Sequence, residues 1–450
     1  MSNAAHNIRM VALILLVGLP LVGIVRDGKP LARYLEFPPT THYVQHASFA
    51  WPAFVGLALL IVLCMAPFIR RIVAHWRESV EPAARHPFPW WGWAGAGFGI
   101  AAWILAWNRF PWFAGWQAFT FSPLWIAYIV VVNALCYCRS GHCMLVDRPR
   151  HLAGLFIASA GFWWFFEYLN RFVQNWYYEG IGTLSPLQYF FFATLPFATV
   201  LPAVMGTCDV LATYPKLTIG LASFPPIAVK HPRLAAGTTL VLAGAGLACV
   251  GVWPDYLFPL LWLAPLLIIT GLQTLSGQVT IFADAGRGDW RRLFQLAMAA
   301  LICGVFWEMW NYYSQAKWIY TVPFVGRFKI FEMPVLGYMG YLPFGWECAV
   351  VSGLMAVRAG TVPRWRSFAR VFLVLAVAAL IWFPVVHLFF RPALADWREP
   401  NGIAREARAL AERQVAVWLG DVSHGYPGCA RDAHRGRTST VFGKNKRGEK

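Results

Sequence analysis

Long apolar segments recur along almost the whole chain, with short polar connections between them. Eleven are apolar over enough residues to cross about 30 Å of hydrocarbon, so the sequence predicts about eleven transmembrane helices, roughly ten to twelve. They lie at residues 10–26, 50–69, 90–108, 123–146, 152–169, 187–207, 236–253, 257–275, 293–311, 335–357 and 369–390. This pattern predicts an all-α, polytopic membrane protein.

Composition agrees with this prediction. Of the 450 residues, 58% are hydrophobic and only 13% are charged, which is not the composition of a soluble protein. The chain is also rich in tryptophan, with 24 residues, and membrane interfaces favour aromatic side chains. The predicted partner is therefore the lipid bilayer.

Basic residues gather in alternate connections, near residues 70–77, 139–150, 216–233, 287–292 and 358–370. By the positive-inside rule these connections face the cytoplasm, together with the N-terminus. We expect a multi-pass protein of a bacterial-type inner (plasma) membrane. The net charge of +17 then needs no nucleic-acid partner, because no connection is long enough for a domain that reads nucleic-acid sequence.

The chain divides into regions by the spacing of these segments. We expect an N-terminal anchor hairpin of two helices over residues 1–89, whose first helix is a retained anchor rather than a secretory signal. Residues 90–360 form a core of eight helices, and residues 361–395 hold the last span. We expect residues 396–420 to form an amphipathic helix on the membrane surface, or alternatively to cap the bundle or bind a partner. Residues 421–450 are expected to form a disordered basic tail.

A polar insertion occurs twice in this apolar background. Glu167-Tyr168-Leu169-Asn170 is followed by Trp176-Tyr177-Tyr178, and Glu308-Met309-Trp310-Asn311 is followed by Trp318-Ile319-Tyr320. A Pro-led apolar segment follows each, which predicts a duplicated two-helix hairpin with both copies in the same direction. Alternatively, outer helix ends simply collect Trp, Tyr, Asn and Pro. Fainter copies lie at 107–125 and 253–260.

Carboxylates inside hydrocarbon are functional candidates because each costs a few kcal/mol there. Glu167 has Arg171 four residues later, which predicts an intrahelical ion pair and a structural role. Glu308 has no basic residue at helical spacing, so burial favours its protonated, proton-donating form. The second copy alone also carries Glu332 and Glu347.

Glu347 also lacks a basic neighbour at helical spacing. It lies roughly 20 Å deep if its helix begins near Pro334, or in the first turn and level with Glu308 if the helix begins near Pro343. Two carboxyls in one cavity would share protons. The alternative is that both only form hydrogen bonds between helices.

A second cluster lies at the inner end of a predicted span and contains Cys136, Cys138, His142 and Cys143. These residue types bind zinc or another soft metal, but the spacing differs from that of familiar zinc fingers. Juxtamembrane Cys residues can also be lipidated or pack as apolar side chains. We predict no metal site and keep these four residues as the weakest candidates.

Known catalytic motifs do not occur in the chain. It has no Walker loop, dinucleotide fingerprint, His-Glu-x-x-His motif, or Gly-x-Ser-x-Gly motif with a plausible triad. The nine Cys residues are scattered and indicate no disulfide framework. We therefore predict no cofactor, and ATP-driven and redox functions have little support.

Three segments of the second copy together resemble the membrane carotenoid enzymes of the lycopene-cyclase and carotenoid-hydratase type. They are the aromatic segment at 318–320, Phe331-Glu332-Met333-Pro334 and Pro343-Phe344-Gly345-Trp346-Glu347. The resemblance covers residues 306–350 only, and Cys348 stands where the cyclases have a second adjacent Glu. It implies proton-initiated chemistry on a polyene or isoprenoid, with Glu308 and Glu347 at the acid positions.

Three functions remain open. The first is an intramembrane enzyme for acid–base chemistry on a lipid or isoprenoid, with Glu308 as general acid, Glu347 as second carboxylate and Asn311 as positioning group. The second is a proton- or cation-coupled transporter or channel using the same carboxylates, and the third is a structural or assembly subunit of a membrane complex. The expected binding residues are Trp307, Trp310, Trp346, Glu167, Asn170, Tyr320 and Glu332.

Overall fold

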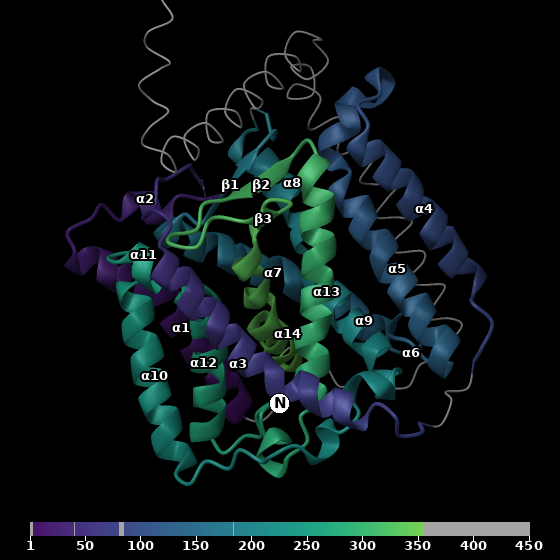
Figure 1. The fold of residues 1–450 in the computed structure, drawn as a ribbon. Helices are drawn as coiled ribbons and strands as arrows, with labels where there is room; N and C mark the ends of the chain where they lie inside the picture. The colour runs from purple at the N-terminus through teal and green to yellow at the C-terminus, as the bar shows by residue number, and fades with distance from the viewer. Residues whose placement is uncertain (1–2, 40, 81–84, 183, 355–450) are drawn as a thin grey trace, which may run out of the picture. The chain divides into compact units, whose positions relative to one another are not determined.

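The computed structural model describes residues 3–39, 41–80, 85–182 and 184–354 (Figure 1). The predicted span at 369–390, the amphipathic segment at 396–420 and the basic tail at 421–450 lie outside the described residues. The described chain is mainly helical, with two short pairs of strands.

Eleven of the described helices have twelve residues or more. They are α1 (Asn3–Arg26), α3 (Trp51–His75), α4 (Trp90–Trp107), α5 (Phe121–Ser140), α7 (Pro149–Val173), α8 (Pro186–Phe197), α9 (Val200–Ala212), α10 (Pro232–Cys249), α12 (Pro259–Leu275), α13 (Arg291–Tyr313) and α14 (Tyr341–Leu354). Short helices α2 (Ala32–Leu35), α6 (Met144–Asp147) and α11 (Pro254–Leu257) lie in the connections, as do the 3-10 helices η1 (Pro111–Phe119), η2 (Pro215–Thr218), η3 (Leu221–Ser223), η4 (Ala285–Arg287) and η5 (Val335–Gly340).

Seven helical segments of the described chain are long and apolar enough to cross a membrane, counting α8 and α9 together. They are α1, α3, α5, α7, α8–α9, α10 and α13, and each coincides with a predicted span. The predicted spans at 90–108, 257–275 and 335–357 coincide with α4, α12 and α14, which do not meet the same combination of length and hydropathy. The prediction of an α-helical membrane protein is thus confirmed. The number of eleven transmembrane helices stays a prediction.

Proline sets the start of many of these helices. Pro149, Pro186, Pro232 and Pro259 each occupy the first turn, where a missing N–H costs nothing and the fixed φ suits the helix. Ser185 completes the start of α8, because its hydroxyl accepts from the Gln188 amide and the Gln188 side chain accepts from the Ser185 amide.

Helix α13 lies at the centre of the described bundle and packs on α14, α9 and α4 (Figure 1). Helices α5 and α9 pack together, α7 packs on α8 and α9, and α10 lies against α12 and α1. Small residues allow α13 and α14 to approach closely, since a Cβ at Gly345 would lie 2.1 Å from the Leu296 carbonyl oxygen.

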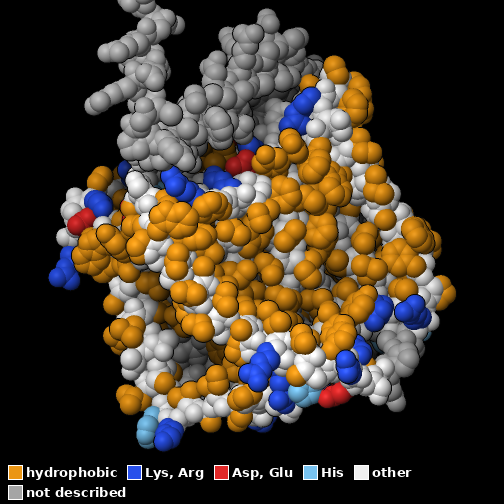
Figure 2. Space-filling model, in the orientation of Figure 1, with side chains coloured by type: hydrophobic (Ala, Val, Ile, Leu, Met, Phe, Trp, Pro, Cys, Tyr) orange, Lys and Arg blue, Asp and Glu red, His pale blue; other side chains and the backbone are white. Residues whose placement is uncertain are grey.

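The outer surface suits a lipid environment. Figure 2 shows hydrophobic side chains over the middle of the visible face, with Lys, Arg and His side chains gathered toward its ends. None of the residues of α3 is buried, although large apolar side chains such as Leu59, Val62 and Leu63 occur on it. Exposing these apolar side chains to water would be unfavourable, whereas exposing them to the hydrocarbon of a bilayer is favourable.

The two strand pairs were not predicted. Strand β1 (Trp176–Glu179) follows α7 and pairs antiparallel with β2 (Lys317–Tyr320), which follows α13, and β3 (Lys329–Ile330) pairs with β4 (Met333–Pro334). The β1–β2 pair therefore joins the two aromatic connections that the sequence repeats. Figure 1 shows it beside the ends of α7 and α13.

Candidate active site

Both asparagines of the repeated Glu-x-x-Asn pattern hold the chain reversal that follows their helix. Asn170 Nδ2 donates to the Trp176 carbonyl oxygen at 2.8 Å, and Asn311 Nδ2 donates to the Trp318 carbonyl oxygen at 2.8 Å. Asn311 Oδ1 also accepts from the Trp318 amide at 2.9 Å. The side-chain amide of each asparagine thus forms hydrogen bonds with the backbone of the strand that follows its helix.

Glu167 is fully buried and receives three side-chain hydrogen bonds. Its Oε1 atom accepts from the Tyr178 hydroxyl at 2.5 Å and from Trp163 Nε1 and Trp176 Nε1, each at 3.1 Å. The predicted ion pair with Arg171 is wrong, because Arg171 instead donates to the Glu36 backbone carbonyl. Aromatic N–H and O–H groups, rather than a basic side chain, therefore satisfy Oε1 of this carboxyl, whereas its Oε2 atom has no hydrogen-bond partner among the described residues.

Glu308 is also fully buried, and its donors come from two different parts of the chain. Its Oε1 atom accepts from the Tyr320 hydroxyl at 2.9 Å and from the Tyr341 hydroxyl at 2.8 Å. Its Oε2 atom has no hydrogen-bond partner among the described residues. Glu308 therefore keeps one carboxyl oxygen uncommitted.

The register of β1 and β2 relates these two carboxyls. Tyr177 lies opposite Ile319, and on either side Trp176 lies opposite Tyr320 and Tyr178 opposite Trp318. Each strand thus sets its tryptophan against the other strand's tyrosine, as a local two-fold axis through the central pair requires. The Tyr178–Glu167 hydrogen bond has its counterpart in the Tyr320–Glu308 bond.

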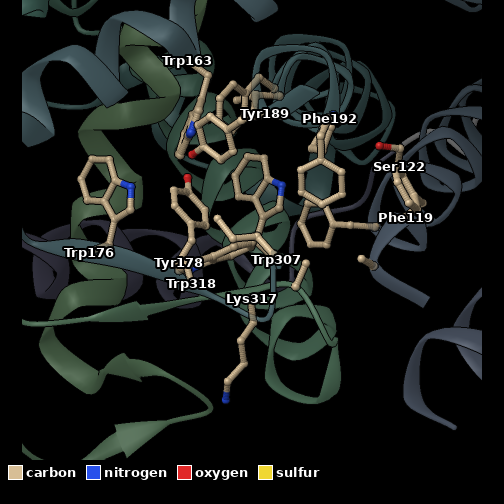
Figure 3. A pocket seen from close by; sticks show the side chains of 18 of the residues that line it. Phe119, Ser122, Trp163, Trp176, Tyr178, Tyr189, Phe192, Trp307, Lys317 and Trp318 are labelled. Carbon is tan, nitrogen blue, oxygen red and sulfur yellow. The ribbon is translucent and has the colours of Figure 1, made fainter. Parts of the chain in front are cut away.

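An aromatic cavity of about 100 Å³ lies beside this strand pair and is partly open to the outside. Figure 3 shows rings of several helices and of both strands around it. Its wall consists of Ala118, Phe119, Phe121, Ser122, Trp163, Trp176, Tyr178, Ile181, Tyr189, Phe192, Ala193, Pro196, Phe197, Val200, Trp262, Trp307, Ala316, Lys317, Trp318, Tyr320 and Tyr341. We name this space the aromatic cavity.

Charged groups are kept out of the aromatic cavity. Neither Glu167 nor Glu308 lines it, whereas Tyr178, Tyr320 and Tyr341, which bind them, do. Lys317 is the one charged residue in the wall, and Figure 3 shows its ammonium turned away from the rings. That ammonium forms a buried ion pair with Glu332, at 2.5 Å.

Burial raises the pKa of Tyr320 well above its usual range, and the neighbouring charge of Glu308 raises it further. The phenol therefore keeps its proton at neutral pH. Tyr320 can pass a proton between the aromatic cavity and Glu308, but it does not act as a phenolate base.

The other predicted site residues lie in several places. Trp307 lines the aromatic cavity, whereas Trp310 packs on Trp125 with ring centroids 5.2 Å apart and Trp346 donates to the Leu293 carbonyl oxygen at 2.8 Å. Glu347 is fully buried, does not line the aromatic cavity, and receives no hydrogen bond from a described residue on either oxygen.

The start of α14 decides the depth of Glu347. That helix begins at Tyr341, after the 3-10 helix η5 and two residues before Pro343, which agrees with the second of the two predicted starts. At 1.5 Å per residue, Glu347 lies roughly 9 Å along α14, closer to the shallower of the two predicted depths. The described part of the span predicted at 335–357 consists of the 3-10 helix η5 followed directly by α14.

Several wall residues were not predicted as site residues. Tyr178 had a signal, since it matches Tyr320 in the repeated pattern. Tyr341, Trp262 and Tyr189 had none, because helices distant in sequence bring them to the cavity. Only the packing of α8, α12 and α14 places these rings at the site.

The four weak metal candidates are not gathered into one site. Among the described residues, no group of three or more His, Cys, Asp or Glu side chains could hold a metal ion. Cys136, His142 and Cys143 line a second cavity, whereas Cys138 donates to the His86 carbonyl oxygen at 3.0 Å.

Comparison of the chain with protein-family models, with curated proteins and with solved structures found no match.

Proposed function

We propose that this protein is an intramembrane enzyme that performs acid–base chemistry on an uncharged lipid or isoprenoid bound in the aromatic cavity. One observation carries the proposal: two hydroxyls of the cavity wall, from Tyr320 and Tyr341, donate to the same buried oxygen of Glu308. A carboxyl that reaches a ligand only through phenols has the geometry of a proton relay.

The relay moves one proton in either direction. When the substrate gives up a proton, a phenol oxygen accepts it while the phenol's own hydrogen passes to Glu308 Oε1. When the substrate is protonated, the phenol donates its hydrogen and recovers one from the Glu308 carboxylic acid. The phenol is unchanged in both cases, so Glu308 is the group that gains or loses the proton.

The cavity wall supports an uncharged substrate. A phosphate or carboxylate inside it would be buried without a counter-ion, which costs several kcal/mol. Ring faces of Trp176, Trp262 and Trp307 can instead stabilise positive charge that develops on a protonated hydrocarbon, by about 0.5–2 kcal/mol for each contact. Such a wall suits proton-initiated chemistry on an isoprenoid, as the resemblance at 306–350 also implies.

We further infer that the two Glu-x-x-Asn hairpins arose by duplication, since their side-chain hydrogen bonds match across the β1–β2 pair. The copies have separate roles in this proposal. Glu167 Oε1 accepts from three donors, two of them indole N–H groups, so this copy holds the strand, whereas Glu308 Oε1 accepts only from two phenols of the cavity wall. The Oε2 atom of each carboxyl has no hydrogen-bond partner among the described residues, so Oε2 does not distinguish the copies. Asn170 and Asn311 are positioning residues, and Glu347 is not part of the relay.

The proposed placement in the membrane follows from charge and span length. About eleven spans with a cytoplasmic N-terminus would put the β1–β2 pair and the aromatic cavity toward the outer face of an inner membrane. A substrate would then be drawn from the outer leaflet.

A proton- or cation-coupled transporter is the second candidate. A buried polar cluster favours the transporter. In this cluster the Tyr128 hydroxyl lies 2.8 Å from Thr207 Oγ1, and Cys303 Sγ lies 3.5 Å from Thr207 Oγ1. The aromatic cavity and a second cavity at Asp209 share no lining residue, however. A pure scaffold gives no reason for an aromatic cavity beside Glu308.

Lipid extracts test the proposal. Cells with the wild-type protein should accumulate a neutral lipid that cells without it lack, detected by mass and by chromatographic retention, since an isomerisation leaves the mass unchanged. Tyr320→Phe and Tyr341→Phe remove one relay hydroxyl each and should reduce that product. Tyr128→Phe removes a buried hydroxyl outside the aromatic cavity and is the matched control. Equal product from all three variants would refute the relay.

A further inference from the structure

A second cavity lies at the opposite ends of the helices that border the first. Phe121 and Ser122 at the start of α5 line the aromatic cavity, whereas Cys136 and Arg139 near its end line the second one. This inner cavity has a volume of about 790 Å³ and is partly open to solvent. It is lined by Cys136, Arg139, Ser140, His142, Cys143, Asp147, Arg148, Asp209, Ala212, Thr213 and Pro215.

The guanidinium of Arg139 is fixed in place by neutral groups. Its Nε donates to Thr213 Oγ1 at 2.8 Å, and its Nη2 donates to the Thr213 carbonyl oxygen at 3.0 Å. Its central carbon lies 3.5 Å from the centroid of the Tyr214 ring. These contacts hold one edge of the planar guanidinium and leave its Nη1 atom for a ligand. The N–H donors of the guanidinium are therefore oriented before a ligand binds.

The acidic side chains of the inner cavity already have partners. Asp209 forms an ion pair with Arg148 at 2.9 Å, and Asp147 lies 3.4 Å from His142 and accepts from the Cys143 amide at 2.8 Å. No carboxylate of the described residues forms an ion pair with Arg139. Asp147 and Asp209 balance the two arginines of the described wall in number, but the hydrogen bonds and the ring contact of the Arg139 guanidinium are all with neutral groups.

We propose that the inner cavity binds a phosphate group, with Arg139 as its main ligand through Nη1 and Arg148 as a second positive charge at the rim. A guanidinium with a fixed plane forms charge-assisted hydrogen bonds to phosphate oxygens, which are about twice as strong as neutral ones.

The phosphate could come from a phospholipid headgroup or from a free phosphate, because both present the same oxygens. The alternating charge pattern predicts that this end of α5 faces the cytoplasm, at the level of the lipid headgroups. The site does not depend on the proposed enzyme activity, since the two cavities share no lining residue.

Binding by the full-length protein in phosphatidylcholine nanodiscs tests the proposal. In one arm phosphatidylglycerol is added to the bilayer, and in the other inorganic phosphate is added to the buffer; the readouts are the thermal unfolding midpoint and native mass spectrometry of retained lipid. Arg139→Gln should weaken phosphate-group binding at least tenfold. Arg139→Lys keeps the charge without the fork and should be intermediate.

Arg70→Gln is the matched control, because Arg70 is an exposed base on the same predicted side that does not line the inner cavity. Stabilisation by phosphatidylglycerol alone would assign the site to a lipid headgroup, and stabilisation by inorganic phosphate as well would assign it to a phosphate group of either source. Equal losses in Arg139→Gln and Arg70→Gln would overturn the proposal, as would a wild-type protein that binds neither ligand. Arg139→Lys keeps the test valid if Arg139→Gln fails to fold.

Discussion

Replacing Glu308 by glutamine separates its chemistry from its contribution to the fold. In Glu308→Gln the side-chain carbonyl can still accept from both Tyr320 and Tyr341, so the aromatic cavity keeps its wall. An amide cannot gain or release the proton that the relay requires. In Glu308→Ala, by contrast, two buried hydroxyls lose their acceptor, at about 1–3 kcal/mol each.

The size of the expected effects follows from these contacts. Loss of a general acid or base lowers a rate about 10²–10⁴-fold, which corresponds to about 3–5 kcal/mol of transition-state stabilisation. Glu308→Gln should therefore lose nearly all product while its unfolding midpoint stays within a few degrees of the wild type. Glu308→Ala should lose both product and stability.

The assay combines lipid mass spectrometry of expressing cells with thermal unfolding of the purified variants. The decisive comparison is product per folded protein in Glu308→Gln against the wild type. If Glu308→Gln makes product at the wild-type rate, Glu308 does not transfer a proton and the relay is wrong. If it unfolds as readily as Glu308→Ala, the carboxyl is structural, and the scaffold interpretation gains support.

Three further predictions concern stability, and each is checked by thermal or denaturant unfolding of the purified protein. Asn311→Ala should cost about 1–3 kcal/mol, because it leaves the Trp318 backbone N–H and C=O without their partner. Lys317→Met should cost about 3–5 kcal/mol by leaving Glu332 buried and unpaired, and adding Glu332→Leu should restore most of that loss. Gly345→Ala should separate α13 from α14 and prevent stable folding, since the added Cβ meets a backbone oxygen; a wild-type midpoint would contradict this packing.

Some features of the site could be predicted because they are local. The Glu and Asn of each pattern lie three residues apart on one helix face, so the sequence alone places them together at the helix end. The aromatic connections follow directly, and their matching residues predicted a repeated unit. The inference failed where a side chain had a choice of partners: Arg171 lies at helical spacing from Glu167, yet it reaches the Glu36 carbonyl instead.

The sequence by itself determined that this is a helical membrane protein, because the length of an apolar segment and the alternation of basic connections act on each helix separately. It also determined which two helices carry buried carboxyls beside an asparagine. Only the tertiary structure decided the rest: the β1–β2 register, the arrival of Tyr341 at Glu308, and the separation of Glu347 from the aromatic cavity. Those contacts join residues far apart in the chain, and packing between helices sets them rather than any periodicity within one helix.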